Sequence, residues 1–429
     1  MPPIRMCRRL IASTALLAAI VLVQSGEAQA LPRFAARNGM ECAQCHVNPT
    51  GGGIRNRYGR DVFAQAWLSR APSRDEAAWT AEALQASELA AKDNGSSPAF
   101  SGELLEWLSI GADVRLAYLW VRPDHAIGGG APDITSTFFL MQADLYHAAR
   151  IGDHLSLVLD IGVYSGFEAW SLIDVFPDAR DYGLYFKLGR FLPPFGVREV
   201  EHQLFTRAGV GLGAGDRDTG LEIGGFVGPL SYHVALLNGT LGDAGFDTSG
   251  TEKRDFEKGV AARVALRGDF GPLRTQVGGS FYFNENMNQP NPLFSGVLPP
   301  ALSGEPSQGV NEIRAGGFLT ASLGRFTYIG DLVYVRDAFF SAAVAPLEGY
   351  ASYQELSFVA LQGLEFVLTA EFMEPNINVA DDATTRLGFV IETFPLPSLE
   401  LRAMVRRSWS DASPTGGAWD VVLFAHTFL

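Results

Sequence analysis

Alternation of apolar and charged residues, repeated many times between about residues 110 and 429, constrains the fold more than any other feature of this chain. Apolar side chains recur at every second position, which is the period of a β-strand with one apolar and one polar face. Such segments lie at 114–120, 155–161, 182–188, 260–266, 364–372 and 399–405. Strands of about ten residues with this pattern are typical of a transmembrane β-barrel, although a soluble β-sandwich also alternates.

The connections between these segments differ in length. Short turns are expected at 152–154, 228–229, 271–272, 324–325, 362–363 and 395–398, and long polar connections at 122–135, 240–257, 284–310, 337–350 and 409–417. Periplasmic turns and extracellular loops alternate in this way in outer-membrane barrels. A direct count gives fifteen strands with adjacent long loops at 165–180 and 193–216, and a turn at 193–196 followed by a strand near 198–207 brings the total to sixteen.

We therefore predict a mainly β fold, in which residues 109–429 form a transmembrane antiparallel β-barrel of about 16 strands behind a small N-terminal α-helical c-type haem domain. At the N-terminus, three arginines precede an apolar run over 10–23, and small residues follow at 28–30. The run is too short for a membrane span, so residues 1–30 are expected to be a secretory signal peptide. The mature chain then retains only Cys42 and Cys45, which excludes a disulfide framework.

Cys42, Cys45 and His46 form a C-x-x-C-H run, the motif that attaches c-type haem. Each thiol adds to a haem vinyl group, and the adjacent imidazole binds the iron on one face. Residues 31–70 are therefore interpreted as a c-type haem segment with one covalent haem c and His46 as the proximal ligand. The alternatives are a chance match, a zinc half-site or a thioredoxin-like pair. Zinc would need a second Cys or His pair, and the redox pair would need a βαβ unit that the pattern does not indicate.

Residues 71–108 are expected to form a helix and a linker. Ser73 and Glu76 make a capping box, and Gly95 ends the helix. The polar run at 94–98 is typical of a linker. The three glycines at 51–53 lack the Gly-Lys-Ser/Thr of a phosphate loop, so they are interpreted as a flexible turn.

Two regions resemble known families. Residues 185–196, together with 218–222 and 232–239, resemble the phosphate-selective porin O/P superfamily, which implies a porin-type barrel and says little about the solute. Residues 34–42, with Cys45, His46 and the run at 58–63, are similar to fused outer-membrane monohaem cytochrome–porins, whose best-known members oxidise ferrous iron at the cell surface. Residues 48–56 depart from that group. The resemblance therefore supports the fused architecture better than it supports iron as the electron donor.

A second axial ligand for the haem iron is not evident near the motif. Between residues 31 and 110 there is no other His, and Met40 lies on the attachment side, two residues before Cys42. Either the distal site holds water or a weak ligand, or an inward-facing barrel residue supplies it. The candidates by parity are His233, Met373 and Met404. His233 comes first, because it begins a strand next to an expected periplasmic turn.

The main functional hypothesis is electron transfer across the outer membrane through the haem, with the haem domain on the periplasmic side or in the barrel lumen. An extracellular donor such as ferrous iron, or an acceptor, and a periplasmic c-type cytochrome or other carrier would be the partners. The alternatives are a diffusion channel whose haem domain is a plug, gate or redox sensor, and a soluble periplasmic haem protein. Outer-membrane lipid is an expected partner, and the formal net charge of -14 argues against nucleic acid. No catalytic residues are expected, so an enzymatic role is open only as an iron-oxidising cytochrome.

Overall fold

The computed structural model describes residues 32–69, 103–124, 134–162, 166–179, 181–198, 201, 203–239, 258–286, 310–339, 345–411 and 413–429. The expected signal peptide and the expected helix that begins near Ser73 lie outside these residues. Of the helices that are described, none is both long enough and apolar enough to cross a membrane.

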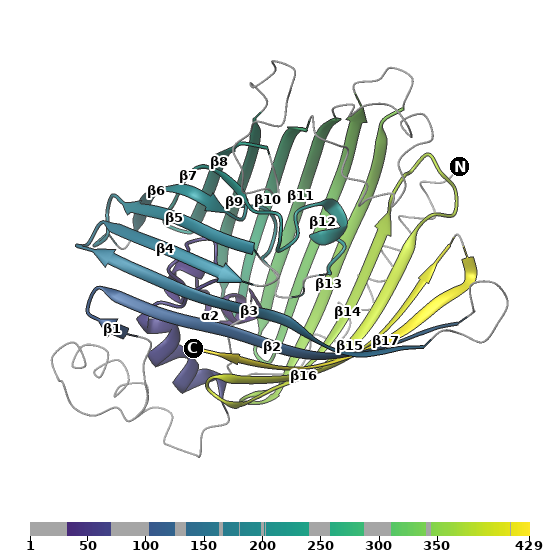
Figure 1. The fold of residues 1–429 in the computed structure, drawn as a ribbon, viewed down its shortest axis with the longest axis horizontal. Helices are drawn as coiled ribbons and strands as arrows, with labels where there is room; N and C mark the ends of the chain where they lie inside the picture. Colours follow the sequence, from purple (N-terminus) through teal and green to yellow (C-terminus); the bar gives the residue numbers. More distant parts are fainter. Residues whose placement is uncertain are drawn as a thin grey trace.

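A closed antiparallel barrel of sixteen strands, β2 to β17, makes up most of the described chain (Figure 1). Each strand pairs with its neighbour in the sequence, and β17 pairs with β2 from Ala418 opposite Pro123 to Phe428 opposite Asp113, which closes the ring. A short strand, β1 (Glu103–Leu105), pairs with the start of β2. The mainly β fold and the number of strands are therefore confirmed.

The barrel strands are β2 (Leu108–Pro123), β3 (Thr135–Ile151), β4 (Leu155–Gly162), β5 (Gly166–Asp174), β6 (Tyr182–Phe191), β7 (Asp218–Val227), β8 (Leu230–Leu237), β9 (Gly259–Phe270), β10 (Leu273–Asn286), β11 (Val310–Leu323), β12 (Phe326–Phe339), β13 (Leu347–Leu361), β14 (Leu364–Glu374), β15 (Thr384–Leu396), β16 (Leu399–Ser410) and β17 (Ser413–Phe428).

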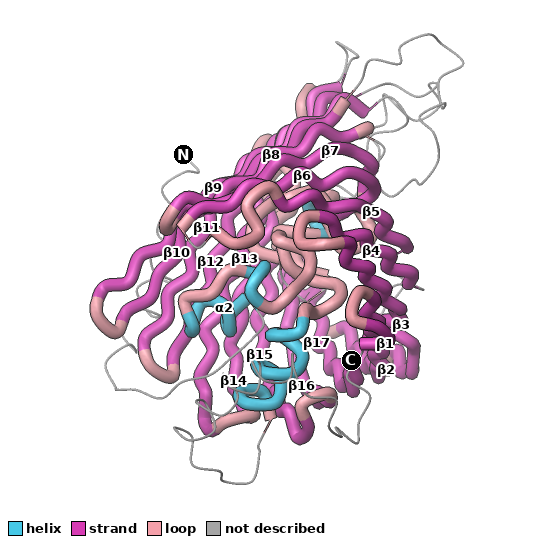
Figure 2. The backbone as a smooth tube through the Cα atoms, turned by 90° about the vertical axis from the view of Figure 1, so that its left-hand side faces the viewer, coloured by secondary structure: helices cyan, strands magenta, loops and turns pink. Residues whose placement is uncertain are grey.

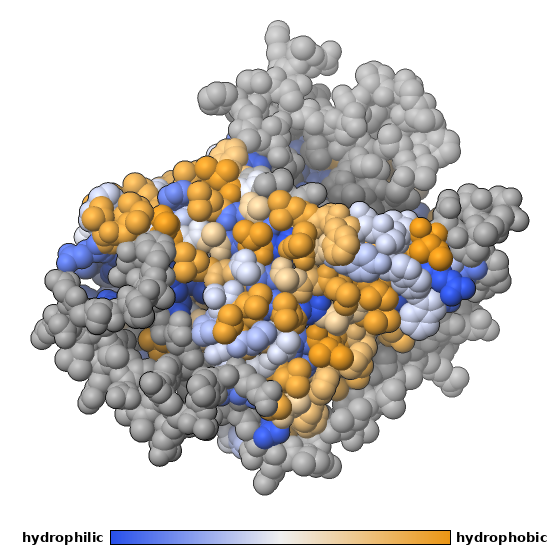
Figure 3. All heavy atoms as spheres, turned by 60° about the horizontal axis from the view of Figure 1, so that its bottom comes forward, coloured by the Kyte–Doolittle hydropathy of each residue, from blue (hydrophilic) through white to orange (hydrophobic). Residues whose placement is uncertain are grey.

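The strand alternation separates a charged interior from an apolar exterior. Lys187, Glu222 and Glu392 are fully buried on the inward faces of their strands. On the outward faces, Leu236 is 57% exposed and Leu368 is 50% exposed. Figure 3 shows apolar side chains, in orange, spread over the outer faces of the strands in view. Because successive side chains of a strand point to opposite faces, the period-two sequence pattern is sufficient to produce this separation.

Short turns gather at one end of the barrel, called here the turn end. All six predicted short turns join consecutive strands there, from the β3–β4 turn to the β15–β16 turn. Five of them contain a glycine with φ between 53° and 73°, a conformation that glycine adopts without steric cost. These glycines are Gly152, Gly228, Gly271, Gly324 and Gly363.

Two details of the predicted strand pattern are wrong. The described residues of 198–207 contain no strand, and the sixteenth strand is instead β5, which lies within the loop expected at 165–180. The connection expected at 409–417 is also much shorter, because β17 begins almost directly after β16. Pro193 and Pro194 lack the backbone N–H of a strand ladder, which favours an irregular path directly before the residues where the extra strand was expected.

The described residues of 192–217, between β6 and β7, fold into the lumen and are called here the inner loop. Their apolar side chains are buried there, among them Phe195, Leu204 and Leu212. The barrel wall holds the backbone of this loop, since Arg314 Nε donates to Val210 O at 2.7 Å. The apolar side chains of the inner loop therefore pack inside the barrel, whereas those on the outer faces of the strands are exposed on the barrel exterior.

Residues 32–69, called here the lumenal segment, occupy the lumen at the turn end. They contain α2 (Pro32–Asn38), the 3₁₀ turn η1 (Cys42–Gln44) and the π-helix η2 (Tyr58–Leu68). Helix α2 contacts β10, β11 and β12, and Figure 2 shows the helices, in cyan, enclosed by the strands. Gln362, in the β13–β14 turn, donates from Nε2 to Ser69 O at 2.9 Å. This contact fastens the last described residue of the segment to the turn end.

Candidate functional site

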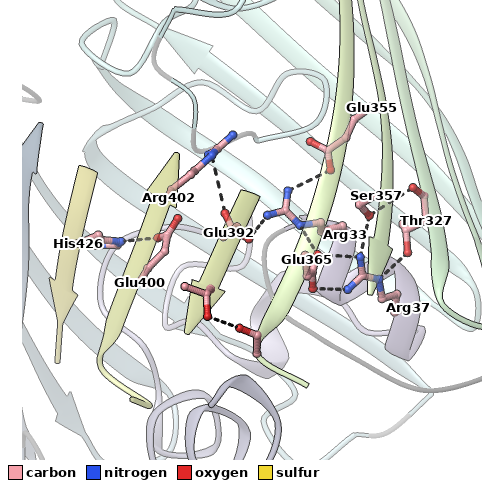
Figure 4. Close-up of polar contacts among 12 residues, drawn as sticks. Arg33, Arg37, Thr327, Glu355, Ser357, Glu365, Glu392, Glu400, Arg402 and His426 are labelled. Carbon is pink, nitrogen blue, oxygen red and sulfur yellow. Dashed lines mark hydrogen bonds and ion pairs between the residues drawn. The ribbon is translucent and has the colours of Figure 1, made fainter. Parts of the chain in front are cut away.

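Two arginines of α2 anchor the lumenal segment among glutamates of the barrel wall. The Arg33 guanidinium lies 3.1 Å from Glu355 and 3.0 Å from Glu365, and it also contacts Glu392. Arg37 Nη2 donates to Glu365 at 2.9 Å. Figure 4 shows both guanidinium groups pointing from α2 toward carboxylates on β13, β14 and β15. None of these five side chains is more than 4% exposed. Because a buried charge is tolerated only when it is paired, these contacts hold the segment in place.

Cys42, Cys45 and His46 lie on one tight turn that follows α2. The backbone N–H groups of Cys45 and His46 both donate to Cys42 O, at 3.1 Å and 2.9 Å. Both thiols are free. All three residues border a lumenal cavity of about 300 Å³, so the turn presents the whole motif to one cavity.

Two of the three glycines in the turn after the motif, Gly51 and Gly52, pack closely against their surroundings. Gly51, Gly52 and Gly53 all have positive φ, at 87°, 73° and 64°. A Cβ atom on Gly51 would lie only 3.2 Å from the sulfur of Cys42, and one on Gly52 would lie 2.6 Å from the guanidinium of Arg198. Glycine is therefore needed here both for its backbone conformation and for the space that it leaves beside Cys42.

His46 is half-buried, and its imidazole is neutral at pH 7. Burial, together with the positive charges of Arg55 and Arg198, lowers the pKa of His46 to about 4. Its Nδ1 is buried and has no hydrogen-bond partner among the described residues. A neutral imidazole is the form in which histidine binds a metal, and an unpaired buried nitrogen is costly unless something occupies it.

The thiols are not activated as thiolates. Burial raises the pKa of Cys42, and burial together with the neighbouring Cys42 raises the pKa of Cys45 to about 12. A thioredoxin-like pair depends on a lowered thiol pKa, so this environment does not fit such a pair. In the part of the chain that the structure describes, no three His, Cys, Asp or Glu side chains are grouped so as to hold a metal ion.

Arginines border the cavity, and some of them already hold neighbouring segments. Arg267 Nη1 donates to Gly39 O of the lumenal segment at 2.5 Å, and Arg263 Nε donates to Gly196 O of the inner loop at 2.8 Å. Arg198 has a buried Nη1 with no hydrogen-bond partner in the described chain. A guanidinium with an unpaired donor suits a carboxylate, and haem carries two propionate carboxylates. The residues around the cavity therefore fit a haem.

The three candidate distal ligands lie in different places. His233 borders the cavity, and its Nδ1 is 2.7 Å from the hydroxyl of Tyr185. Met373 packs against the inner loop, where a Cβ atom on Gly209 would lie 3.3 Å from its sulfur. Met404 is buried in an apolar cluster of the wall. Neither methionine borders the cavity as the described residues define it.

Sequence analysis missed a histidine at this cavity. His426, on β17, is 3% exposed and borders the same cavity as His46. Its neighbours at two-residue spacing, Phe424 and Phe428, are also buried. The same parity argument, applied to the last strand, could have found His426. The cavity thus brings together His46, His233 and His426.

Comparison with known proteins concerns the barrel. No protein-family model matches the sequence, and no curated protein matches it either. Among solved structures, the anion-selective porin from Comamonas acidovorans is 11% identical with a TM-score of 0.51, over 75% of this chain and 99% of that chain. The high-pH structure of Pseudomonas putida OprB is 10% identical with a TM-score of 0.50, over 84% and 99% of the two chains.

A loop L8 deletion mutant of OmpT, an outer membrane protein of Vibrio cholerae, is similar to the same degree. It is 11% identical with a TM-score of 0.50, over 75% of this chain and 99% of that chain. At these identities the likeness establishes the fold alone. The chain has a porin-like barrel of sixteen antiparallel strands.

Proposed function

We propose that the chain is a bacterial outer-membrane barrel whose lumenal segment carries one c-type haem, held covalently by Cys42 and Cys45 with His46 as an iron ligand. The haem transfers electrons between the two sides of the membrane. The observation that carries this proposal is that the three motif residues border one arginine-lined cavity inside a closed barrel. The turn end faces the periplasm, as short turns do in outer-membrane barrels.

Each part of the protein has a defined task in this proposal. The haem iron, when bound, supplies a one-electron redox couple. Cys42 and Cys45 hold the group, His46 binds the iron, and Arg198 pairs with a propionate carboxylate. The ion pairs of Arg33 keep the lumenal segment in one position. The barrel wall separates the site from the apolar layer of the membrane, which is about 25 Å tall.

Two partners follow from this arrangement. A periplasmic c-type cytochrome or another soluble carrier meets the protein at the turn end, and an extracellular donor or acceptor meets it at the other end. Ferrous iron is the first external donor to test, because the motif region resembles iron-oxidising cytochrome–porins. The two directions of electron flow are distinguished by reversing the donor and the acceptor in the assay described below.

A diffusion channel in which the lumenal segment is a plug, gate or redox sensor is the second candidate. The likeness to solved porin structures favours this candidate more than it favours electron transfer. The arginines at the cavity give it a specific form, an anion-conducting pore that opens when the plug moves. The buried anchors of Arg33 and Arg37 oppose such movement.

The first test is covalent attachment of haem. The full-length protein, exported in a host that matures c-type cytochromes, is purified in detergent and extracted with acidified organic solvent. The proposal expects one haem per chain to stay with the protein. Haem that extracts completely, or a protein without haem, contradicts it.

The second test separates the two candidates. Proteoliposomes enclose ferricyanide, and ferrous iron is added outside. Electron transfer reduces the enclosed ferricyanide without releasing it, and the His46→Ala variant loses this activity. Leakage of ferricyanide, together with open-pore conductance in planar bilayers, identifies a diffusion channel instead.

A further inference from the structure

We propose that His426 is the second axial ligand of the haem iron and that Glu400 is its positioning residue. This inference rests on the proposed function, because it requires the haem held by Cys42 and Cys45. The ligand would come from the last strand of the barrel, so that the lumenal segment and the barrel wall share one coordination sphere.

The contact between Glu400 and His426 fixes the proton on one ring nitrogen. His426 Nδ1 lies 2.8 Å from Glu400 Oε2, and both side chains are buried, at 3% and 2% exposure (Figure 4). A carboxylate only accepts hydrogen bonds, so Nδ1 carries a proton in this contact and Nε2 is the ring nitrogen left for a metal. Metal-binding histidines almost always donate their other N–H to a carboxylate, a carbonyl or water in this way.

Nε2 of His426 is left without a hydrogen bond. It is buried and has no hydrogen-bond partner among the described residues. Oδ1 of Asp113 lies 3.5 Å from Nε2, within ion-pair distance but longer than a usual hydrogen bond, and the hydroxyl of Tyr146 donates to the other oxygen, Oδ2, at 2.9 Å. A buried nitrogen of this kind costs free energy unless a ligand uses it. An iron ion at the cavity would bind Nε2 and remove this cost.

A chain of contacts joins His426 to the motif. Arg55 pairs with His46 in an isolated antiparallel bridge. The Arg55 guanidinium carbon lies 4.1 Å from the centroid of the Phe428 ring, and that ring lies 4.9 Å from the ring of His426. His426 therefore belongs to the wall against which the motif turn is packed.

His233 is the rival ligand at the same cavity. Its Nδ1 contacts the hydroxyl of Tyr185, which in turn donates to Glu222 at 2.5 Å. That contact is to a neutral group, whereas Glu400 gives His426 the charged acceptor that raises the basicity of a ligand. His233 is consequently the matched control, since it is a buried inward histidine of the same barrel and cavity.

The test compares the optical and electron paramagnetic resonance spectra of full-length, haem-loaded wild type with those of His426→Ala and His233→Ala. We expect low-spin iron in the wild type and in His233→Ala, and loss of the low-spin signal in His426→Ala. His426→Gly with added imidazole should recover it. Glu400→Gln should raise the midpoint potential relative to the wild type, because the ligand becomes less basic.

Each opposite result overturns the inference. A high-spin wild type means that no strong second ligand exists, and an unchanged low-spin spectrum in His426→Ala means that another group supplies it. Loss of the signal in His233→Ala alone assigns the ligand to His233. Heat-modifiable migration in gels reports that each variant barrel is folded. A wild type without covalent haem refutes the proposed function, which is a separate outcome from these.

Discussion

Replacing Arg33 by Met should release the lumenal segment from the barrel while the barrel itself stays folded. Arg33 contacts three carboxylates, and its side chain and theirs are at most 3% exposed. Methionine keeps the length of the side chain and removes the charge. The carboxylates then remain buried with fewer partners when the segment is seated, but regain water when it leaves the lumen.

The structure allows a magnitude to be assigned. Without Arg33, Glu365 still pairs with Arg37, and Glu355 still accepts a hydrogen bond from the hydroxyl of Tyr353 at 2.6 Å. The carboxylates therefore lose only some of their partners. Removing one partner of a buried ion pair costs about 3–5 kcal/mol. The equilibrium between seated and released segment should therefore shift on the order of 10²- to 10³-fold toward release. Adding Glu392→Gln to the variant should restore part of the lost stability, because it removes a buried charge whose remaining partner, Arg402, lies 3.9 Å away.

Limited trypsin digestion of the folded protein measures this shift, with mass spectrometry reading cleavage after Arg55 and Arg60. When opening and closing are fast, the cleavage rate follows the released population. The control is Arg150→Met, which removes an exposed pair with Asp153 at 3.7 Å, for which about 0–1 kcal/mol is expected. Cleavage at the wild-type rate in a folded Arg33→Met barrel would refute the anchoring argument.

Three further predictions concern attachment, lipid contact and the wall. Cys42→Ala should weaken or abolish covalent haem attachment in a folded barrel, and a haem-stained denaturing gel checks this. Leu368→Arg, in the middle of an outward strand face, should destabilise the barrel by about 2–4 kcal/mol in a bilayer, against about 0–1 kcal/mol for Leu361→Arg near the turn end. Equal losses in urea titrations of the two variants would contradict an outward lipid face. Lys187→Met should lower the free energy of unfolding by about 3–5 kcal/mol in the same titration, since Lys187 pairs with Glu222 at 2.9 Å and both are fully buried. An unfolding midpoint equal to that of the wild type would show that the pair is not needed for stability.

The strands and short turns could be predicted because their signals are local. Period two and turn glycines are read within a few residues, and the β3–β4 and β9–β10 turns lie where the sequence placed them. The strand β5 was missed because the structure gives it short connections on both sides, with no long loop to mark its end. The path of the inner loop into the lumen was not predicted, because the sequence of an apolar residue such as Leu212 does not tell whether its side chain faces lipid or the lumen. Closure of the barrel decides between the two.

Some residues of the candidate site could also be predicted from local sequence, and others could not. Cys42, Cys45 and His46 are adjacent in the sequence, so their motif could be recognised without any fold. His426 could have been proposed from its parity on the last strand, but no local pattern distinguishes it from another inward strand residue. Met373 and Met404 had the right parity as well, and the structure sets both away from the cavity.

By itself, the sequence determined the strand period, the short turns and the C-x-x-C-H motif, because each depends on residues a few positions apart. Only the tertiary structure decided which distant residues meet. Arg33 reaches Glu355 across 322 positions of the chain, and His426 reaches the cavity of His46 because β17 pairs with β2 and closes the ring. Such contacts depend on how all sixteen strands are joined, and no segment of the sequence carries that information alone.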